Sequence, residues 1–274
     1  MITRIFLALM AVAAILAASS YESEIAAWRA DRIAKLKAED GWLSLAGLFW
    51  LHDGANPFGK DPKLEIALPD GAEHAGVFHL DKGKVTVTVG DKTFPVEPDS
   101  DTSMVRVGRL HLFVIKRGDK YGIRLKDPES EARRGFTHIE SYPVNEAYRV
   151  MARWVPERRT IPILNIIGQT EQDDSPGYAV FKLQGREFTL HPILETPDAK
   201  ELFYIFRDAT TGKETYPAGR FFYSPMPKDG QVVIDFNKAY NPPCAFTPYA
   251  TCPLPPPENR MAIRIEAGEK KYGH

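Results

Sequence analysis

The sequence predicts a mainly β protein, in which a short N-terminal helix is followed by two packed antiparallel β-rich halves of sandwich or barrel-like form. Short apolar or alternating segments recur at intervals of about ten residues. Gly, Pro, Asn and Asp separate these segments, as is typical of strands joined by tight turns. This spacing favours a sandwich or barrel over βαβ units.

Residues 1–20 have the order of a secretory signal peptide. Arg4 is followed by an apolar run from Ile5 to Leu16 and then by the small residues 17–20. Cleavage after residue 19 or 20 would place small residues at both recognition positions. Because the apolar run is shorter than the ~20 residues that span a bilayer, we expect export to the periplasm or the extracellular space, with no membrane span after cleavage. A segment retained as a membrane anchor is the less favoured alternative.

The segment 21–41 is predicted to be an amphipathic helix. Its apolar residues, which include Ile25, Trp28 and Leu36, fall near one face at helical spacing, with charged residues elsewhere. We expect the helix to dock through Trp28 and to end at the glycine Gly41.

Two β-rich halves are expected after the helix, a sandwich-like half over 42–130 and a second half over 131–274 that carries a loop rich in cysteine and proline. The polar segment 126–135 interrupts the strands between them. Hairpins are predicted to turn at Gly118–Asp119 and at Gln184–Gly185. Further strands are expected within 42–51, 83–90, 147–155, 201–206, 219–224, 231–236 and 261–267.

Composition excludes some classes of partner. A formal net charge of −1, with 43% hydrophobic and 26% charged residues, is ordinary for a soluble globular protein. It gives no electrostatic reason to expect nucleic acid or an anionic membrane surface. The sequence has no GxSxG, HExxH or GxGxxG motif, and we expect neither a cofactor nor a metal.

Two polar loops resemble known motifs only in part. The segment 208–215, DATTGKET, lacks the first glycine and the spacing of a phosphate-binding P-loop and is predicted to be a hairpin loop. The segment 170–177, TEQDDSPG, groups Glu171, Asp173 and Asp174, which could bind calcium in an exported protein. It does not match the EF-hand pattern, so a solvated acidic loop is favoured.

The two cysteines, Cys244 and Cys252, lie in the proline-rich segment 241–260. In an exported protein a disulfide bond between them is favoured over reactive thiols and over a metal site. On the chain-entropy model a bridge across so short a loop would stabilise the fold by about 2.6 kcal/mol, less any strain. A catalytic thiol would need a base, and no histidine lies near these cysteines in the sequence.

Polar residues gather where the strand ending near residue 235 meets the prolines. Asx residues form turns by bonding to nearby backbone amides, which is one explanation of their presence. The other is a pocket with donors, acceptors and an aromatic face for a small polar ligand, whose carboxylates could also act as general acid and base. The candidate ligand-binding residues are Arg220, Asp235, Asn237, Tyr240, Asn241, Glu266 and Glu269.

Several blocks resemble the bacterial and archaeal family called domain of unknown function 1684. They are GWLSLAGLFWLHDGANPFG, RGDKYGIRLKDP, FRDATTGKETYPAGRFFYSP, VIDFNKAYNPPCAFTPYATCPLPPPENR and EAGEKKY. The resemblance covers nearly all of the chain after the signal segment. It implies no established activity.

A weaker resemblance, through LHDGANPFGKDPKLEIALPD, is to forkhead-associated domains, which are β-sandwiches that read phosphothreonine. It suggests a sandwich fold for the N-terminal half. Lys60 follows Gly59 where those domains have an arginine, and no Ser and His pair follows, which argues against phosphopeptide reading.

Two functions agree with these features. The first is an exported soluble protein that binds a small polar ligand, a glycan or a protein through its C-terminal half, with Tyr240, Phe246 and Tyr249 presented near the cysteine loop. The second is a hydrolase that uses Asp235 with Glu266 or Glu269, or a thiol enzyme that uses Cys244. We expect the binding protein, because it requires no catalytic pair.

Overall fold

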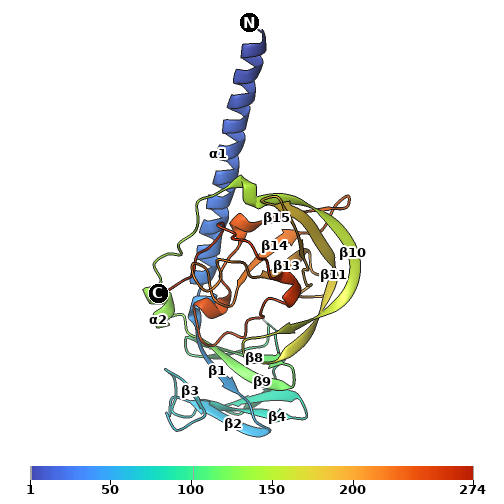
Figure 1. Cartoon of the computed structure of the whole chain (residues 1–274). Helices are drawn as coiled ribbons and strands as arrows, with labels where there is room; N and C mark the ends of the chain where they lie inside the picture. The colour runs from blue at the N-terminus through green and yellow to red at the C-terminus, as the bar shows by residue number, and fades with distance from the viewer. Residues whose placement is uncertain (1, 101, 274) are drawn as a thin grey trace. The chain divides into compact units, whose positions relative to one another are not determined.

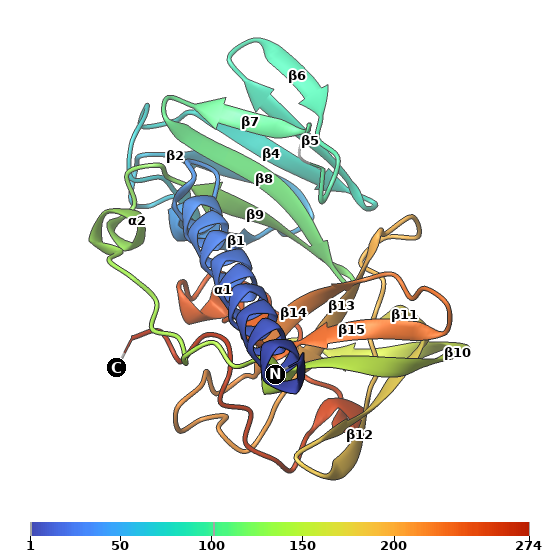
Figure 2. The same ribbon diagram turned by 90° about the horizontal axis from the view of Figure 1, so that it is seen from above.

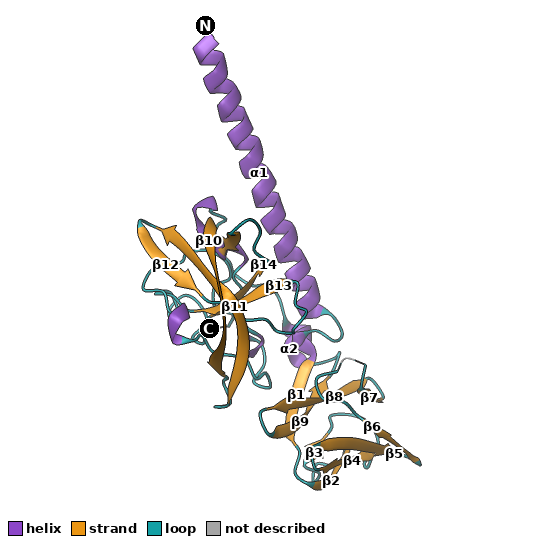
Figure 3. Cartoon of the chain, turned by 90° about the vertical axis from the view of Figure 1, so that its right-hand side faces the viewer, coloured by secondary structure: helices purple, strands orange, loops and turns teal. Residues whose placement is uncertain are grey.

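The computed structural model describes residues 2–100 and 102–273, with side chains described from residue 20 onward. The chain divides into two compact units. Unit 1 consists of Met1–Ala34, His138–Ala245 and Cys252–His274, and unit 2 consists of Lys35–Thr137 and Phe246–Thr251. Strands make up most of the regular structure, so the predicted mainly β fold class is confirmed (Figure 3). None of the sheets that the described residues form closes into a barrel.

The N-terminal helix α1 runs without interruption over Ile2–Lys37 (Figure 1). Within unit 1, Tyr21 and Ile25 are buried, and the Trp28 ring lies 6.4 Å from the ring of Tyr240, centroid to centroid. The helix is therefore anchored through one apolar face, as its spacing predicts. Over the side chains that the structure describes, no helix is both long enough and apolar enough to cross a membrane.

The prediction that this helix ends at Gly41 is wrong. It ends at Lys37, and Gly41 has a φ of −67° rather than a left-handed conformation. A glycine is nevertheless required, because a Cβ there would lie 2.4 Å from the carbonyl oxygen of Lys35. The segment 42–51 is also not strand throughout, since Trp42–Ser44 forms a 3-10 turn before the first strand.

Unit 2 is a sandwich of two sheets. In the first, in the order β1-β9-β8-β7, the strands are β1 Leu45–Trp50, β7 Met104–Val107, β8 Leu110–Arg117 and β9 Lys120–Lys126. In the second, in the order β3-β2-β4-β5-β6, they are β2 Gly54–Gly59, β3 Ile66–Ala67, β4 Gly76–Asp81, β5 Lys84–Val89 and β6 Lys92–Pro95. Phe78 and Val87 of the second sheet share one buried cluster with Leu112 and Ile123 of the first. The short helix α2, Glu131–Gly135, follows β9.

Unit 1 contains a four-stranded sheet in the order β12-β11-β10-β15 and the pair β13-β14 (Figure 2). The strands are β10 Arg149–Leu164, β11 Thr170–Leu183, β12 Arg186–Leu190, β13 Glu201–Phe206, β14 Arg220–Pro225 and β15 Gln231–Asp235. Phe181 and Ile234 of the sheet pack in one core with Phe206 and Phe222 of the pair. The hairpin turns predicted at 118–119 and 184–185 are confirmed, since each lies between two paired strands.

Two local predictions in unit 1 are wrong. Residues 170–177, expected as a solvated loop, belong to β11 and pair antiparallel with residues of β10. Their side chains alternate between more and less exposed positions. Residues 261–267, expected as a strand, alternate in burial but form no strand. The carbonyl groups of Ile265 and Ala267 accept hydrogen bonds from the side chain of Arg220, and that of Ile263 accepts from the backbone N–H of Ala209.

Candidate functional site

The candidate site is a cleft of about 670 Å³ that lies entirely within unit 2. Its volume is within the range of small-molecule sites. It is lined by a set of apolar residues and a set of polar residues. The apolar lining is Leu45, Ala46, Phe49, Ala67, Leu68, Pro69, Leu125, Ala132, Phe246, Pro248 and Tyr249, and the polar lining is Arg109, Asp127, Glu129, Ser130, Glu131, Arg134 and Thr247.

The loop Phe246–Thr251 forms one wall and is held at both ends. Near its start, the Thr247 hydroxyl donates to the carbonyl oxygen of Leu45 at 3.0 Å. At its end, Thr251 Oγ1 accepts from Arg117 at 3.1 Å and from Arg124 at 2.9 Å. Tyr249 remains 37% exposed between these anchors, so its ring is available to a ligand.

The polar wall is built around Arg109, which lies in the turn between β7 and β8. Its Nε and Nη2 donate to the two carboxylate oxygens of Asp127 at 2.9 and 3.2 Å, and its Nη1 donates to Asp70. Burial would raise the pKa of Asp127, but hydrogen bonds from Arg109 and from the backbone N–H of Glu129 outweigh it and hold this pKa below its usual value. Asp127 is therefore a fixed acceptor, and Arg109 has little capacity left for a ligand.

Helix α2 adds a second cation, Arg134, whose charge also helps to hold the pKa of Asp127 low. Ser130 caps this helix by accepting from the N–H of Arg133 at 3.2 Å, and its own hydroxyl donates to the carbonyl of Leu43. Arg134, which lines the cleft, makes no side-chain hydrogen bond with any residue that the structure describes. It is thus the cation in this cleft that can meet an anionic group of a ligand.

The residues that the sequence singles out lie elsewhere, in unit 1. Arg220 is 1% exposed and donates to the carbonyl oxygens of Ile265 at 3.0 Å, Ala267 and Glu269 at 3.3 Å. It also pairs with the buried carboxylate of Asp208 at 3.4 Å. Burial lowers the pKa of Arg220, which the nearby Asp208 partly offsets. Its contacts are those of a structural residue that holds the C-terminal segment.

Asp235 and Asn237 are grouped with Tyr21 of α1. The Tyr21 hydroxyl donates to Asp235 at 2.8 Å, and burial together with this carboxylate raises the pKa of Tyr21. Asn237 donates to the carbonyl of Asn145 at 2.9 Å and accepts from its N–H at 3.0 Å. Asp235 also accepts from the backbone N–H of Asn237 at 3.1 Å and so caps the 3-10 turn Phe236–Lys238, which is the turn-forming role for this residue.

Three further residues meet around Arg32 of α1. Glu269, which is 3% exposed, accepts from Arg32 Nε at 3.2 Å and from the backbone N–H of Asn241 at 2.7 Å. Burial raises the pKa of Glu269 despite the opposing charge of Arg32. The guanidinium carbon of Arg32 lies 4.4 Å from the centre of the Tyr240 ring. Glu266 is apart from this group and pairs with Arg264 on the surface at 2.7 Å.

The structure thus brings Tyr240, Asn241 and Glu269 together, and it places Asp235 with Asn237, but it does not join the seven candidates into one pocket. Their ligand-binding role stays a prediction. Sequence reasoning missed Arg109, Asp127 and Arg134, which come from two turns and a short helix and follow no recognisable motif. The available signal was the aromatic content of the loop at Phe246 and Tyr249.

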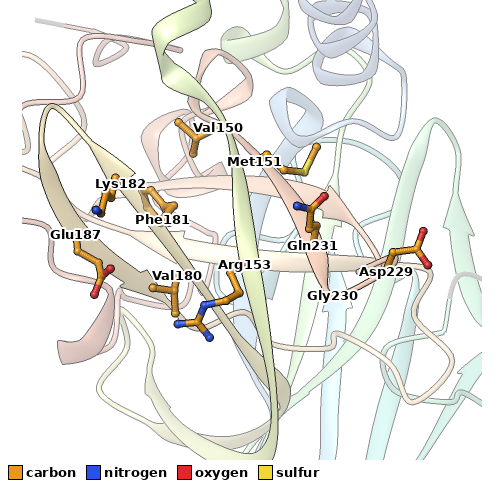
Figure 4. Close-up of a pocket in the computed structure, with 10 residues that line it drawn as sticks. All are labelled: Val150, Met151, Arg153, Val180, Phe181, Lys182, Glu187, Asp229, Gly230 and Gln231. Atoms are coloured by element: carbon orange, nitrogen blue, oxygen red, sulfur yellow. The ribbon is translucent and has the colours of Figure 1, made fainter.

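A second hollow, of about 720 Å³, lies beside the sheet in unit 1 (Figure 4). Its lining residues, labelled in Figure 4, belong to β10, β11, β12, the first position of β15 and the turn that precedes it. Arg153 and Lys182 are accompanied there by Glu187 and Asp229. Because Phe181 is the one aromatic residue in its lining, this hollow is a weaker candidate than the cleft of unit 2.

No bond joins Cys244 and Cys252, which are both present as thiols, so the predicted disulfide is not formed in this structure. The backbone N–H of Cys244 donates to the sulfur of Cys252 at 3.1 Å, and the Tyr216 hydroxyl donates to the carbonyl of Cys244 at 2.8 Å. A hydrogen bond from Cys252 lowers the pKa of Cys244, and this effect exceeds the opposing effect of burial. The two thiols are neighbours.

The architecture defines a class, namely mainly β proteins built from open, antiparallel sheets with a mixed apolar and polar surface cleft. Within it, the chain belongs to the family described as "Protein of unknown function (DUF1684)", whose family model matches residues 134–270. The resemblance noted in the sequence is confirmed over that half of the chain.

A solved structure from Haloarcula marismortui, determined by NMR and titled an uncharacterized protein, is similar at 29% sequence identity. The similarity covers 50% of this chain and 78% of the other, with a TM-score of 0.43. No curated protein matches the chain.

Proposed function

We propose that this protein binds a small amphipathic molecule in the cleft of unit 2. The observation that carries the proposal is the meeting of two aromatic residues, Phe246 and Tyr249, with the guanidinium of Arg134 in one cleft of about 670 Å³. An apolar ligand face would pack on the aromatic and aliphatic wall, and a polar or anionic edge would meet Arg134.

The positions of the carboxylates favour a ligand-binding function over a hydrolase function. A carboxylate mechanism needs two acidic groups beside one another with different environments. Asp235 is bonded to Tyr21, Glu266 to Arg264, and Glu269 to Arg32, so the three carboxylates that the sequence suggests have different partners. In the cleft itself, Asp127 is held ionised by Arg109, which suits positioning more than proton transfer.

Replacing Tyr249 by alanine is expected to weaken ligand binding about fivefold to tenfold, because one aromatic wall of the cleft is lost. The probe is 8-anilinonaphthalene-1-sulfonate, which joins apolar rings to an anionic group, followed by fluorescence titration. Phe94→Ala is the matched control, since Phe94 is 40% exposed in the same unit but does not line the cleft.

Arg134→Met is expected to lower the affinity for the same probe, because the sulfonate group loses its cationic partner. Absence of saturable probe binding to the wild-type protein would refute the proposal. So would an equal loss of affinity in Tyr249→Ala and Phe94→Ala.

We also propose that residues 1–20 direct export and are removed. The support is the order of charged, apolar and small residues in the sequence. Intact-mass measurement of the protein recovered from outside the cytoplasm is expected to give a chain that begins at Ser20 or Tyr21. A recovered chain that keeps its first twenty residues would contradict this.

A further inference from the structure

We infer that Cys244 and Cys252 form a dithiol site that exchanges with a disulfide-bonded oxidant, with Cys244 as the attacking sulfur and Cys252 as the resolving one. Seven residues separate them, and six of these are the loop Phe246–Thr251 of the cleft. Oxidation would therefore close the chain on either side of that loop. The effect of oxidation on the cleft rests on the proposed function, whereas the thiol–disulfide exchange does not.

Proximity is the first argument. The N–H of Cys244 points at the Cys252 sulfur from 3.1 Å, and the Cys252 thiol is also hydrogen-bonded to the Cys244 side chain. An attacking thiol and a resolving thiol must meet in this way for a mixed disulfide to be resolved within one chain.

The division of roles follows from exposure and charge. Cys252 is 4% exposed, whereas Cys244 is partly exposed and can be reached by an oxidant. The hydrogen bond from Cys252 favours the thiolate of Cys244, which is the reactive form of the sulfur.

The exchange balances with one disulfide, RSSR. The Cys244 thiolate attacks one sulfur of RSSR, the S–S bond breaks, and RS⁻ leaves and takes up a proton. Cys252 then loses its proton to water, and its thiolate attacks the Cys244 sulfur. The mixed disulfide breaks, and the second RS⁻ is protonated. Two protein thiols are oxidised to one disulfide, and RSSR is reduced to two RSH.

The test uses the full-length protein, oxidised glutathione and intact-mass measurement. The wild type is expected to lose two hydrogens and to retain no adduct. Cys252→Ser, which keeps the attacking sulfur, is expected to accumulate one glutathione adduct, and Cys244→Ser to do so at least about tenfold more slowly. A stable adduct on the wild type, no reaction of the wild type, or equal rates in the two variants would overturn the dithiol site.

A second measurement tests the link to the cleft. Affinity for 8-anilinonaphthalene-1-sulfonate is expected to differ at least about threefold between the reduced and oxidised wild type, and to be unaffected by oxidant in the Cys244→Ser/Cys252→Ser variant. Equal affinity of the two redox forms would overturn the link and leave the exchange site standing. Absence of probe binding in both forms would overturn the proposed function, and with it the effect of oxidation on the cleft. The thiol–disulfide exchange is measured separately, by intact mass.

Discussion

Replacing Arg220 by alanine is expected to lower the free energy of unfolding by about 3–5 kcal/mol. The side chain is fully enclosed and satisfies three carbonyl groups of the segment 265–269 as well as the Asp208 carboxylate. Without it, those acceptors are buried unpaired, and Asp208 is left as an uncompensated buried charge. Urea denaturation followed by circular dichroism measures the loss.

Arg220→Lys is expected to retain only part of this stability, because one ammonium group cannot reach the acceptors that the planar guanidinium spans. Arg264→Ala is the control, since Arg264 pairs with Glu214 and Glu266 on the surface, and its loss is expected to cost less than about 1 kcal/mol. A similar cost for Arg220→Ala and Arg264→Ala would show that the buried arginine does not hold the C-terminal segment.

Replacing Asp173 by asparagine is expected to stabilise the protein at neutral pH but not in acid. Burial, followed by the charges of Glu171, Asp174 and Glu195, raises the pKa of Asp173 to about 6 from 3.8. The folded protein therefore binds a proton here more tightly than the unfolded chain does. The stability that this provides is complete below pH 3.8 and is lost as the pH rises through 6.

The gain in Asp173→Asn at pH 7 is expected to be about 1–2 kcal/mol after allowance for solvent screening of this half-buried group. Unfolding measured in urea at pH 3.5 and at pH 7 tests it, with the exposed Glu201→Gln as the control. A gain of the same size at both pH values would show that ionisation of Asp173 is not its cause.

Local patterns predicted the elements whose structure is set by their own residues. Both hairpins were predictable from their turn residues, since Gly118 in one, with a φ of 58°, and Gln184 and Gly185 in the other, with φ values of 50° and 75°, adopt the left-handed conformation that tight turns favour. The failures occur where a distant group intervenes. Residues 261–267 have a strand-like alternation, but the side chain of Arg220, more than forty positions away, bonds the carbonyl groups of Ile265 and Ala267.

The cleft was beyond prediction for a similar reason. Phe246 and Tyr249 could be named as ligand contacts from the sequence, but Arg109 and Asp127 meet only because β8 and β9 are neighbours in a folded sheet. Among the candidates near residue 235, Asp235 and Asn237 make hydrogen bonds within the fold. Buried Asp, Asn and Arg side chains that satisfy backbone groups have the same composition as a ligand site, and sequence alone does not separate the two.

The assignment of Phe246–Thr251 to unit 2 has a consequence for synthesis. A ribosome releases both sheets of unit 2 once Thr137 has emerged, but the final wall of the cleft follows more than a hundred residues later. While the strands of unit 1 are being synthesised, unit 2 therefore lacks this wall, and the surface around Leu45 stays uncovered. A recombinant fragment that stops at Thr137 would contain the sandwich without its last piece, and joining Phe246–Thr251 to it through a short linker is the natural way to produce unit 2 alone.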